Sequence, residues 1–357
     1  MKPRSIRVAA RPAFSNAGTN PYNELLYRAV STAGPVVREH RYSMPPWACD
    51  ILHLHWPEFD VIPRSMRPLD VLKKLPVWAW LMFARAVGVK IVWTAHNTFG
   101  HDLKASRFNL FLWNRFLSML DGVIFLSEES RAAIVSAYPG MDRLPYVLIR
   151  HGHYGPWIEG VRAAAEPPAT EVAQVLARLE GSFVVLNFGQ MRRYKNVDVL
   201  MRRFSALDDA DVRLLVAGGV GDADYQLELE ALAATDPRIV LLPRHMDDAS
   251  LAACLKRADL VVLPYRKILN SGSALMALSA GKHVVAPAIG SMRALQRDVG
   301  ADALTLFDGP LHAGILRDAV ERIRTHHVSP PDLGAYEWPL LGRQTARFYH
   351  GLLMESA

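Results

Sequence analysis

The chain has 357 residues, a length typical of two domains, and 50% of them are hydrophobic, enough for sizeable cores. Its formal net charge of +6 suits phosphorylated ligands or anionic lipid. No nucleic-acid motif accompanies this charge, so we do not expect nucleic acid as a partner. Cys49 and Cys254 stand far apart without metal-type neighbours, which fits a reducing cytosol. The N-terminus "MKPRSIRVAARP" lacks a long apolar core, so we expect no signal peptide.

Short apolar runs alternate with helical patterns along the chain. Strands are predicted at 6–10, 50–55, 90–96, 121–127 and 146–152, and then at 182–189, 212–219, 238–243, 259–264, 283–287 and 303–307. Helices are predicted between these strands, for example at 196–208, 225–235, 248–257 and 272–280. This alternation predicts an α/β fold with two Rossmann-like parallel-sheet domains.

The segment 155–180 contains Pro167-Pro168 and no strand-like run, so we interpret it as a linker and an entry helix. The expected domains are therefore 1–158 and 159–337. Ligands of open α/β sheets bind beyond the carboxyl ends of the strands. Polar or glycine residues follow the strands of both halves, which predicts two facing half-sites with a cleft between them: His53, His55, His96, Asn97, His151, His153, Gly189, Gly218, Gly219 and Tyr265.

The segment "NAGTNPYNELL" follows the first strand. Gly18 and Thr19 form a tight turn, and Asn20 is placed to cap a helix that begins at Pro21. The amides at such a helix start suit an anion or a sugar hydroxyl. The alternative is a plain strand-to-helix turn.

The segment "FGQMRRYKNVDVLM" places Arg192, Arg193 and Lys195 in one short loop after Gly189. Three cations repel one another unless an anion binds, and a diphosphate is the obvious candidate. A solvated charge cluster is the alternative. In "LNSGSALMALSAG", Ser271, Gly272 and Ser273 stand at a predicted helix start, where hydroxyls and amides suit the same diphosphate. Simple capping would explain one of the two serines.

The segment 64–90 mixes basic residues with large apolar ones. Its uncharged run of about ten residues is shorter than the roughly 20 needed to span a bilayer. A helix of this composition suits a membrane interface, and 107–120 is similar. The alternative is two ordinary helices that cover a sheet. The predicted membrane contacts are Lys73, Lys74, Trp78, Trp80 and Phe83.

Several histidines stand at strand ends, which raises zinc as an alternative. The chain has no cysteine pair and no His-Glu-x-x-His spacing, so we expect no metal. Loop carboxylates suit general-base catalysis, and Glu58 and Asp102 follow predicted strands.

A set of stretches in one order resembles the GT-B glycosyltransferases, in particular glycosyltransferase family 94. They run from residue 19 to near 349 and comprise "TNPYNELLYRAV", "DILHLHWPE", "TAHNTFGHD", "RHGHYGPW", "FGQMRRYKNVDVL", "DLVVLPYRKILNSGSALMALSAGKHVVAP" and "YEWPLLGRQTARFY". The resemblance implies a peripheral enzyme on the inner face of the plasma membrane. Such an enzyme moves mannose from GDP-mannose to a polyprenyl-diphosphate-linked oligosaccharide in bacterial exopolysaccharide synthesis, without a metal or other cofactor. The tail 338–357 would cross back onto the first domain as a helix.

The resemblance also implies roles for individual residues. Donor-binding residues would be Gly189, Arg192, Arg193, Lys195, His245, Met246, Tyr265, Ser271, Gly272 and Ser273. Acceptor-binding or sugar-binding residues would be Gly18, Thr19, Asn20, His55, Asn97, His151 and His153. The base candidates are Glu58, Asp102 and His96. Asn196 departs from the pattern, which has glycine after the lysine.

Two positions depart from the large retaining families, whose donor loop carries two glutamates. Ile268 and Met276 stand in their places. A carboxylate therefore cannot contact the sugar from either position, which favours an inverting transferase whose base lies in the first domain. The alternatives are a retaining or UDP-sugar-dependent transferase and a non-catalytic sugar-nucleotide-binding module.

Overall fold

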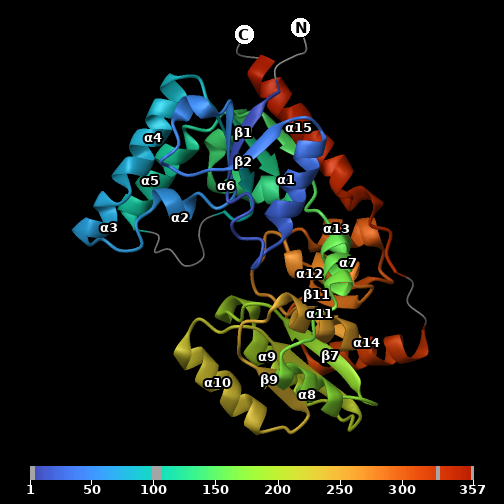
Figure 1. Cartoon of the computed structure of the whole chain (residues 1–357). Helices are drawn as coiled ribbons and strands as arrows, with labels where there is room; N and C mark the ends of the chain where they lie inside the picture. The colour runs from blue at the N-terminus through green and yellow to red at the C-terminus, as the bar shows by residue number, and fades with distance from the viewer. Residues whose placement is uncertain (1–4, 99–105, 327–329, 355–357) are drawn as a thin grey trace. The chain divides into compact units, whose positions relative to one another are not determined.

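The computed structural model describes residues 5–98, 106–326 and 330–354, and it divides the chain into two compact units (Figure 1). Unit 1 comprises Met1–Gly152 and Ala335–Ala357, and unit 2 comprises His153–Gly334. Each unit contains a six-stranded sheet whose strands all pair in parallel. This is the α/β architecture with two parallel sheets that the alternating pattern predicts.

The sheet of unit 1 has the order β2-β1-β3-β4-β5-β6. Its strands are β1 (Arg7–Arg11), β2 (Val36–Glu39), β3 (Ile51–Leu54), β4 (Lys90–Ala95), β5 (Gly122–Phe125) and β6 (Tyr146–Leu148). Its helices are α1 (Tyr22–Thr32), η1 (Pro46–Ala48), α2 (Glu58–Val61), α3 (Pro68–Leu72), α4 (Leu75–Ala86), α5 (Arg107–Leu117), α6 (Glu128–Ala137), η2 (Pro139–Arg143) and α15 (Trp338–Met354).

Helices α1 and α15 pack side by side in unit 1 (Figure 1). Their core includes Tyr27 and Tyr349, both buried. Gly342 allows the two backbones to approach, because a Cβ there would lie 2.5 Å from the carbonyl carbon of Ala29. The C-terminal helix is thus an integral part of the unit that the N-terminal strands form.

The sheet of unit 2 has the order β12-β11-β10-β7-β8-β9. Its strands are β7 (Phe183–Phe188), β8 (Val212–Ala217), β9 (Ile239–Leu242), β10 (Leu260–Val262), β11 (His283–Pro287) and β12 (Leu304–Phe307). Its helices are α7 (Gly155–Ala164), α8 (Thr170–Arg178), η3 (Arg193–Lys195), α9 (Val197–Ser205), α10 (Ala223–Ala234), α11 (Asp248–Arg257), α12 (Gly272–Ser279), α13 (Met292–Val299) and α14 (Ala313–Thr325). The segment η4 (Gly334–Tyr336) spans the division between the units.

The structure differs from the prediction in one strand, in the segment 155–180 and in the position of the division between the units. Strand β2 was not predicted, because it is an edge strand that buries none of its residues fully. The segment 155–180 is not a linker with one helix, since both α7 and α8 form there. The division falls after Gly152, earlier than residue 158, because α7 contacts α11 and α12 of unit 2.

No helix among the described residues is both long enough and apolar enough to cross a bilayer. Residues 64–90 instead form the short helices α3 and α4, with exposed as well as buried side chains.

Candidate functional site

The loop between β1 and α1 contains the predicted acceptor residues Gly18, Thr19 and Asn20. The Asn20 side chain accepts a hydrogen bond from the Tyr22 amide at 3.2 Å, and α1 begins at Tyr22, one residue later than predicted. Gly18 and Thr19 are exposed. The loop therefore presents these two residues to solvent beside a helix start.

A carboxylate holds the beginning of this loop. Glu39 Oε2 accepts hydrogen bonds from the amides of Ala13, Phe14 and Ser15 at 3.0, 2.7 and 3.0 Å. Consecutive amides of this kind form an anion-binding turn. The chain's own carboxylate fills this turn, so its amides do not remain for a phosphate. Glu39 is thus a structural residue of this loop that the sequence reading missed.

A chain of hydrogen-bonded side chains lies beyond β3 and β4. The Tyr27 hydroxyl is 2.9 Å from His53 Nδ1 and 2.6 Å from His55 Nε2. His55 Nδ1 is in turn 2.9 Å from His96 Nε2. His96 is half-buried and stacks on Trp56, with ring centroids 4.6 Å apart.

The predicted contact of His55 with the acceptor is wrong. Its side chain is fully buried, and both ring nitrogens already have partners within the chain of hydrogen bonds. His55 lies behind His96, which is the more exposed of the two. The alternating side chains of a strand placed His53 and His55 on one side of β3, and that side faces the interior.

Burial keeps these imidazoles neutral. It lowers the pKa of His53 to about 3 and of His151 to about 4, and it lowers the pKa of His55 and His96 well below the usual value. His151 packs on Tyr22, with ring centroids 4.3 Å apart. Among the described residues, no three histidine, cysteine or acidic side chains are arranged to hold a metal ion.

Two of the predicted residues stand apart from this cluster. His153 belongs to unit 2, where it is buried and its Nδ1 accepts a hydrogen bond from the Gly155 amide at 3.0 Å. It holds the start of α7, so its predicted contact with the acceptor has no support in this geometry. Asp102 lies outside the described residues.

Glu58 is a buried carboxylic acid at the start of α2, with only 3% of its surface exposed. Burial raises its pKa to about 7, although hydrogen bonds that include one with Asn97 act in the opposite direction. Its Oε1 is buried and has no hydrogen-bond partner among the described residues. A carboxyl group with a pKa near neutrality and one unsatisfied oxygen suits a general base.

In unit 2, three predicted donor residues converge. Gly189 has a positive φ of 94°, and a Cβ there would lie 3.6 Å from Lys195 Nζ and 3.7 Å from Ser273 Oγ. Lys195 Nζ also lies 5.7 Å from the centre of the Tyr265 ring. The loop after β7 and the start of α12 therefore place an ammonium group, a hydroxyl and an open glycine together.

Two effects disfavour the charged form of the Lys195 side chain. Burial lowers its pKa to about 8, and the positive charge of Arg192 acts in the same direction. The Arg192 guanidinium donates to Gln190 Oε1 at 2.9 Å. A bound anion would relieve the repulsion, so this pair is chemically suited to a phosphate oxygen.

Arg193 does not join this pair. Its guanidinium contacts Asp222 at 3.2 Å and Glu228 at 3.1 Å, and it lies over the Tyr225 ring. These contacts direct it toward α10. The predicted contact of Arg193 with the donor is therefore not supported, and Lys195, which is half-buried, is the cation beside Gly189.

The start of α12 has the predicted capping geometry. Ser271 is buried, and its Oγ accepts a hydrogen bond from the Ala274 amide at 3.1 Å. Gly272 and Ser273 are the first residues of the helix. Burial raises the pKa of the nearby Tyr265 to about 12, and hydrogen bonds with both serines oppose this rise. Ser271 thus has a structural role, whereas the Ser273 hydroxyl is near Lys195.

The turn before α11 contains His245 and Met246, which are exposed and half-buried. The Gly219 Cα lies next to it, since a Cβ there would be 3.7 Å from the His245 amide nitrogen. Gly218 has a φ of 153°, and a Cβ there would lie 2.2 Å from the Gly189 carbonyl oxygen. Gly218 therefore lets the loop after β8 approach the β7 loop closely, and Gly219 places the same loop beside the His245 turn.

Ile268 and Met276 provide no carboxylate to the donor loop. Met276 is buried in α12, with 9% of its surface exposed. The Ile268 carbonyl packs against Gly290, whose φ is 54° and where a Cβ would lie 2.2 Å from that oxygen. Both residues thus belong to the packing of unit 2.

The predicted membrane residues are only partly exposed. Trp80 is buried at 7% exposure and donates to the Met44 carbonyl at 2.6 Å, so its predicted membrane contact is wrong. Trp78 is half-buried and donates to the Val61 carbonyl at 3.1 Å. Lys74 is half-buried and donates to the Phe59 carbonyl. Lys73 and Phe83 are exposed.

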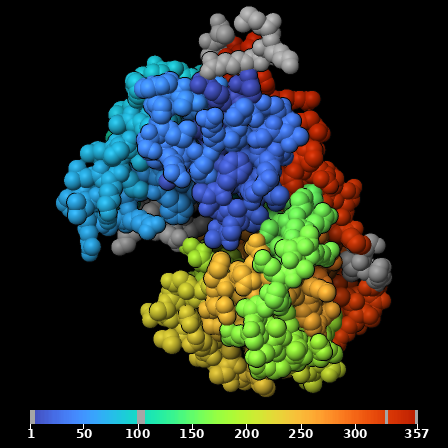
Figure 2. Space-filling model, in the orientation of Figure 1, coloured from blue at the N-terminus to red at the C-terminus, as the bar shows by residue number. Residues whose placement is uncertain are grey.

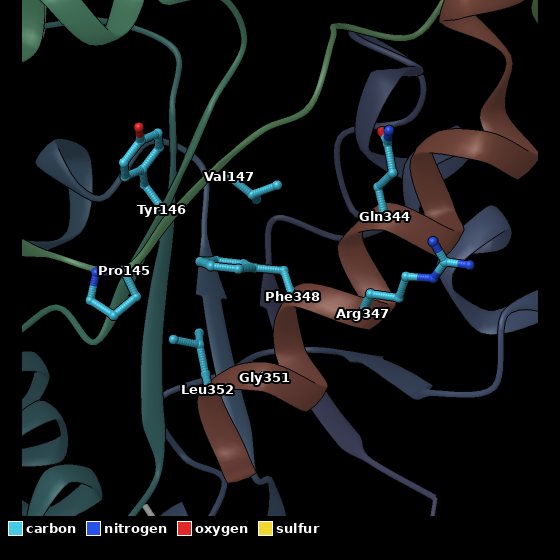
Figure 3. Close-up of a pocket in the computed structure, with 8 residues that line it drawn as sticks. All are labelled: Pro145, Tyr146, Val147, Gln344, Arg347, Phe348, Gly351 and Leu352. Carbon is cyan, nitrogen blue, oxygen red and sulfur yellow. The ribbon is translucent and has the colours of Figure 1, made fainter. Parts of the chain in front are cut away.

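A cavity of about 480 Å³ lies between β6 and α15 in unit 1 (Figure 3). Phe348 and Leu352 extend from α15 toward the strand that carries Tyr146 (Figure 3). The cavity begins at Pro145, at the amino end of β6, whereas the histidine cluster lies at the carboxyl ends of the strands. It therefore does not include the predicted acceptor residues.

Comparisons with known proteins agree with this fold. A family profile described as glycosyl transferases group 1 matches residues 182–321. A GDP-mannose:glycolipid 4-beta-D-mannosyltransferase of Xanthomonas campestris pv. campestris is 30% identical, over 96% of this chain and 94% of the relative.

Two solved structures share the fold at low identity. Sucrose-phosphate synthase from Thermosynechococcus elongatus has a TM-score of 0.63 at 17% identity and matches 98% of this chain and 95% of that one. HepE of Anabaena, solved in complex with UDP-glucose, has a TM-score of 0.61 at 14% identity, over 98% of this chain and 99% of that one. Together with the full-length relative, they identify the chain as an enzyme of the GT-B glycosyltransferases, in the family that includes the glycolipid mannosyltransferase of Xanthomonas.

Proposed function

We propose that this enzyme moves mannose from GDP-mannose, with inversion, onto a polyprenyl-diphosphate-linked oligosaccharide during exopolysaccharide synthesis in bacteria. The observation that carries the proposal is the similarity to the glycolipid mannosyltransferase over 96% of the chain. The positions in unit 2 where retaining families have glutamates hold Ile268 and Met276, which supports inversion.

Unit 2 would bind the donor through its diphosphate. Lys195 and Arg192 supply positive charge, and Gly189 and Ser273 leave room and a hydroxyl beside it. As the bond between the sugar C1 and the diphosphate breaks, negative charge grows on the leaving group, and fixed cations stabilise it. In this proposal the charge comes from side chains rather than from a bound metal.

Unit 1 would supply the base. The Glu58 carboxylate takes the proton of the acceptor hydroxyl while that oxygen attacks C1 from the face opposite the diphosphate. One oxygen–carbon bond forms as the carbon–oxygen bond to the diphosphate breaks, and GDP leaves with the electron pair. The raised pKa of about 7 supports this role, because such a carboxyl group can hold the proton near neutral pH.

A thermal-shift screen tests the donor. We expect GDP-mannose and GDP to raise the Tm, because a ligand that binds only the folded state stabilises it by RT ln(1 + L/Kd), where L is the free ligand concentration. UDP-glucose and ADP-glucose at the same concentration serve as controls. UDP-glucose is the more stringent control, because HepE, which shares the fold, was solved in complex with it. Selective stabilisation by UDP-glucose would contradict the proposed donor and favour the UDP-sugar alternative.

We also propose that α3, α4 and α5 contact the inner face of the plasma membrane. Figure 2 shows the segment that carries α3 and α4, in lighter blue, at the surface of unit 1. Large apolar side chains are exposed on and beside these helices: Met66, Leu69, Leu72, Leu75, Met82, Phe83 and Phe111. Exposed basic side chains stand among them: Arg64, Arg67, Lys73, Arg85, Arg107 and Arg115. This composition suits an interface with anionic lipid.

Replacing Leu69, Leu72 and Phe83 with serine is expected to reduce binding to anionic liposomes on the order of tenfold or more, because all three present apolar surface to solvent. Co-sedimentation measures the effect. Leu227→Ser is the matched control, since Leu227 is 64% exposed on α10 of unit 2. Sedimentation of the triple variant at the wild-type level would refute this membrane surface.

A further inference from the structure

We propose that Tyr27 and His55 are positioning residues that fix His96 as a hydrogen-bond donor to a substrate oxygen, which excludes His96 as the general base. The inference deepens the proposed function and rests on it, because it assigns the division of labour between His96 and Glu58. It concerns residues of unit 1 alone.

The proposal begins with an unbroken chain of buried contacts. Thr94 Oγ1 lies 2.7 Å from His53 Nε2, and His53 Nδ1 lies 2.9 Å from the Tyr27 hydroxyl. The Tyr27 hydroxyl lies 2.6 Å from His55 Nε2, and His55 Nδ1 lies 2.9 Å from His96 Nε2. His53, His55 and Thr94 are fully buried. Burial lowers the pKa of His53, His55 and His96, so each imidazole is neutral, with one nitrogen that donates and one that accepts.

Tyr27 sets the direction of its own contacts, because its hydroxyl has a single proton to donate. The contact of 2.6 Å with His55 has the short length of a hydroxyl donor, whereas the contact with His53 is longer, at 2.9 Å. Tyr27 thus donates to His55 Nε2. By the same criterion the Tyr349 hydroxyl, 2.6 Å from His53 Nδ1, donates to that nitrogen.

The proton positions on the remaining imidazoles follow, because each neutral ring carries one proton. His55 accepts at Nε2, so its proton is on Nδ1, and it donates to His96 Nε2. The proton of a neutral His96 is then on Nδ1. At the other end, His53 accepts at Nδ1, so its proton is on Nε2 and it donates to Thr94 Oγ1.

His96 consequently has no lone pair available for an acceptor proton. Its Nε2 lone pair takes the His55 proton, and its Nδ1 already carries a proton. Within the described part of the chain, His96 Nδ1 has no hydrogen-bond partner, and the ring is half-buried at the carboxyl end of β4. Trp56 on its face and Tyr22 at 5.2 Å hold the ring plane. The outward N–H suits a hydroxyl or ring oxygen of a sugar.

Two substitutions of His96 separate a donor from a base. In His96→Asn the side-chain amide takes the place of the Nδ1–H group, whereas His96→Ala removes it. We expect His96→Asn to retain kcat within about tenfold of wild type and His96→Ala to lose about a hundredfold or more. Equal losses in both variants would overturn the donor role. Absence of mannosyl transfer by the wild-type enzyme would instead refute the proposed function.

The tautomer itself is observable without turnover. Long-range ¹H–¹⁵N spectra of ¹⁵N-histidine-labelled enzyme distinguish Nδ1–H from Nε2–H, and the signals lost in His96→Asn assign His96. We expect an Nδ1–H pattern for His96, and an Nε2–H or doubly protonated pattern in wild type would overturn the proposal. This result stands whatever the donor sugar is.

Tyr27→Phe tests the positioning role. It removes the proton that His55 Nε2 accepts, so His55 and His96 should shift toward the opposite tautomers, and kcat should fall about tenfold with little change in the KM for the donor. Tyr225→Phe is the control, because Tyr225 is an equally buried tyrosine whose hydroxyl donates to Asp198 in unit 2. An unchanged His96 pattern in folded Tyr27→Phe would overturn the role of Tyr27. If Tyr27→Phe does not fold, the wild-type spectrum still decides the tautomer.

Discussion

Glu58→Gln is expected to lower kcat by about 10²–10⁴-fold, because glutamine keeps the shape of the side chain but cannot take a proton. The KM for GDP-mannose should change little, since Glu58 belongs to unit 1 and the donor residues belong to unit 2. Steady-state transfer to a synthetic lipid-linked acceptor measures both quantities. Glu24→Gln is the control, because Glu24 forms a surface ion pair with Arg28 in the same unit.

The pH dependence identifies the group. Burial raises the pKa of Glu58 to about 7, so the carboxylate form, which is the active base, increases as the pH rises through 7. The wild-type kcat/KM should therefore rise to a plateau on the acid side of its profile. Glu58→Gln should lose this acid limb together with most of its activity. A Glu58→Gln enzyme with near wild-type kcat and an unchanged acid limb would leave Asp102 as the remaining carboxylate candidate.

Lys195→Ala is expected to reduce kcat/KM for GDP-mannose by about 10²–10³-fold, because it removes a cation that stabilises the leaving diphosphate. Arg193→Ala is the matched control. Arg193 is two residues away, but Asp222 and Glu228 hold its guanidinium near α10. Steady-state kinetics with varied donor distinguish the two variants. A large loss in Arg193→Ala with little loss in Lys195→Ala would contradict the assignment of the donor site.

The titration of Lys195 is expected to determine how the KM for the donor changes at alkaline pH. Burial and Arg192 lower its pKa to about 8, so the ammonium loses its charge as the pH rises through 8 and the KM for the donor should increase. Lys195→Arg should shift this limb to higher pH, since a guanidinium stays charged. A chelator should leave both enzymes unaffected if side chains supply the charge.

Most of the fold follows from local pattern. The strands of both sheets are continuous apolar runs, as expected for parallel strands covered on both faces, and every predicted strand forms. Strand β2 does not follow this rule, because it lies at the edge of the sheet, pairs only with β1 and has no fully buried residue. The helix α8 begins at Thr170, two residues after Pro168, so the pair of prolines marks a helix boundary there rather than an extended linker.

The sequence predicted which residues form the donor loop but not which way their side chains point. Sequence spacing placed Gly189, Lys195 and Ser273 at the ends of neighbouring elements, and the structure brings them together. Sequence spacing could not show which cation of the loop points toward Gly189 and Ser273. Arg193 turns to α10 because Asp222 and Glu228 lie there, and that acidic pair comes from a distant part of the sequence.

The histidine cluster shows a similar limit. Strand alternation put His53 and His55 on one side of β3, yet it could not tell that this side faces α1. Tyr27 was missed because it occupies a core position of that helix, where a tyrosine is usually packing alone. The sequence did contain a signal for Tyr27: its hydroxyl lies on the apolar face of α1, and two histidines follow on the strand.

The central claim is inverting transfer of mannose to a lipid-linked acceptor. The most direct measurement is NMR of the product formed from GDP-α-D-mannose and a synthetic polyprenyl-diphosphate oligosaccharide, with the anomeric C1–H1 coupling read at the new linkage. We expect a β-mannosidic product. An α-linked product, or transfer only from a UDP-sugar, would contradict it.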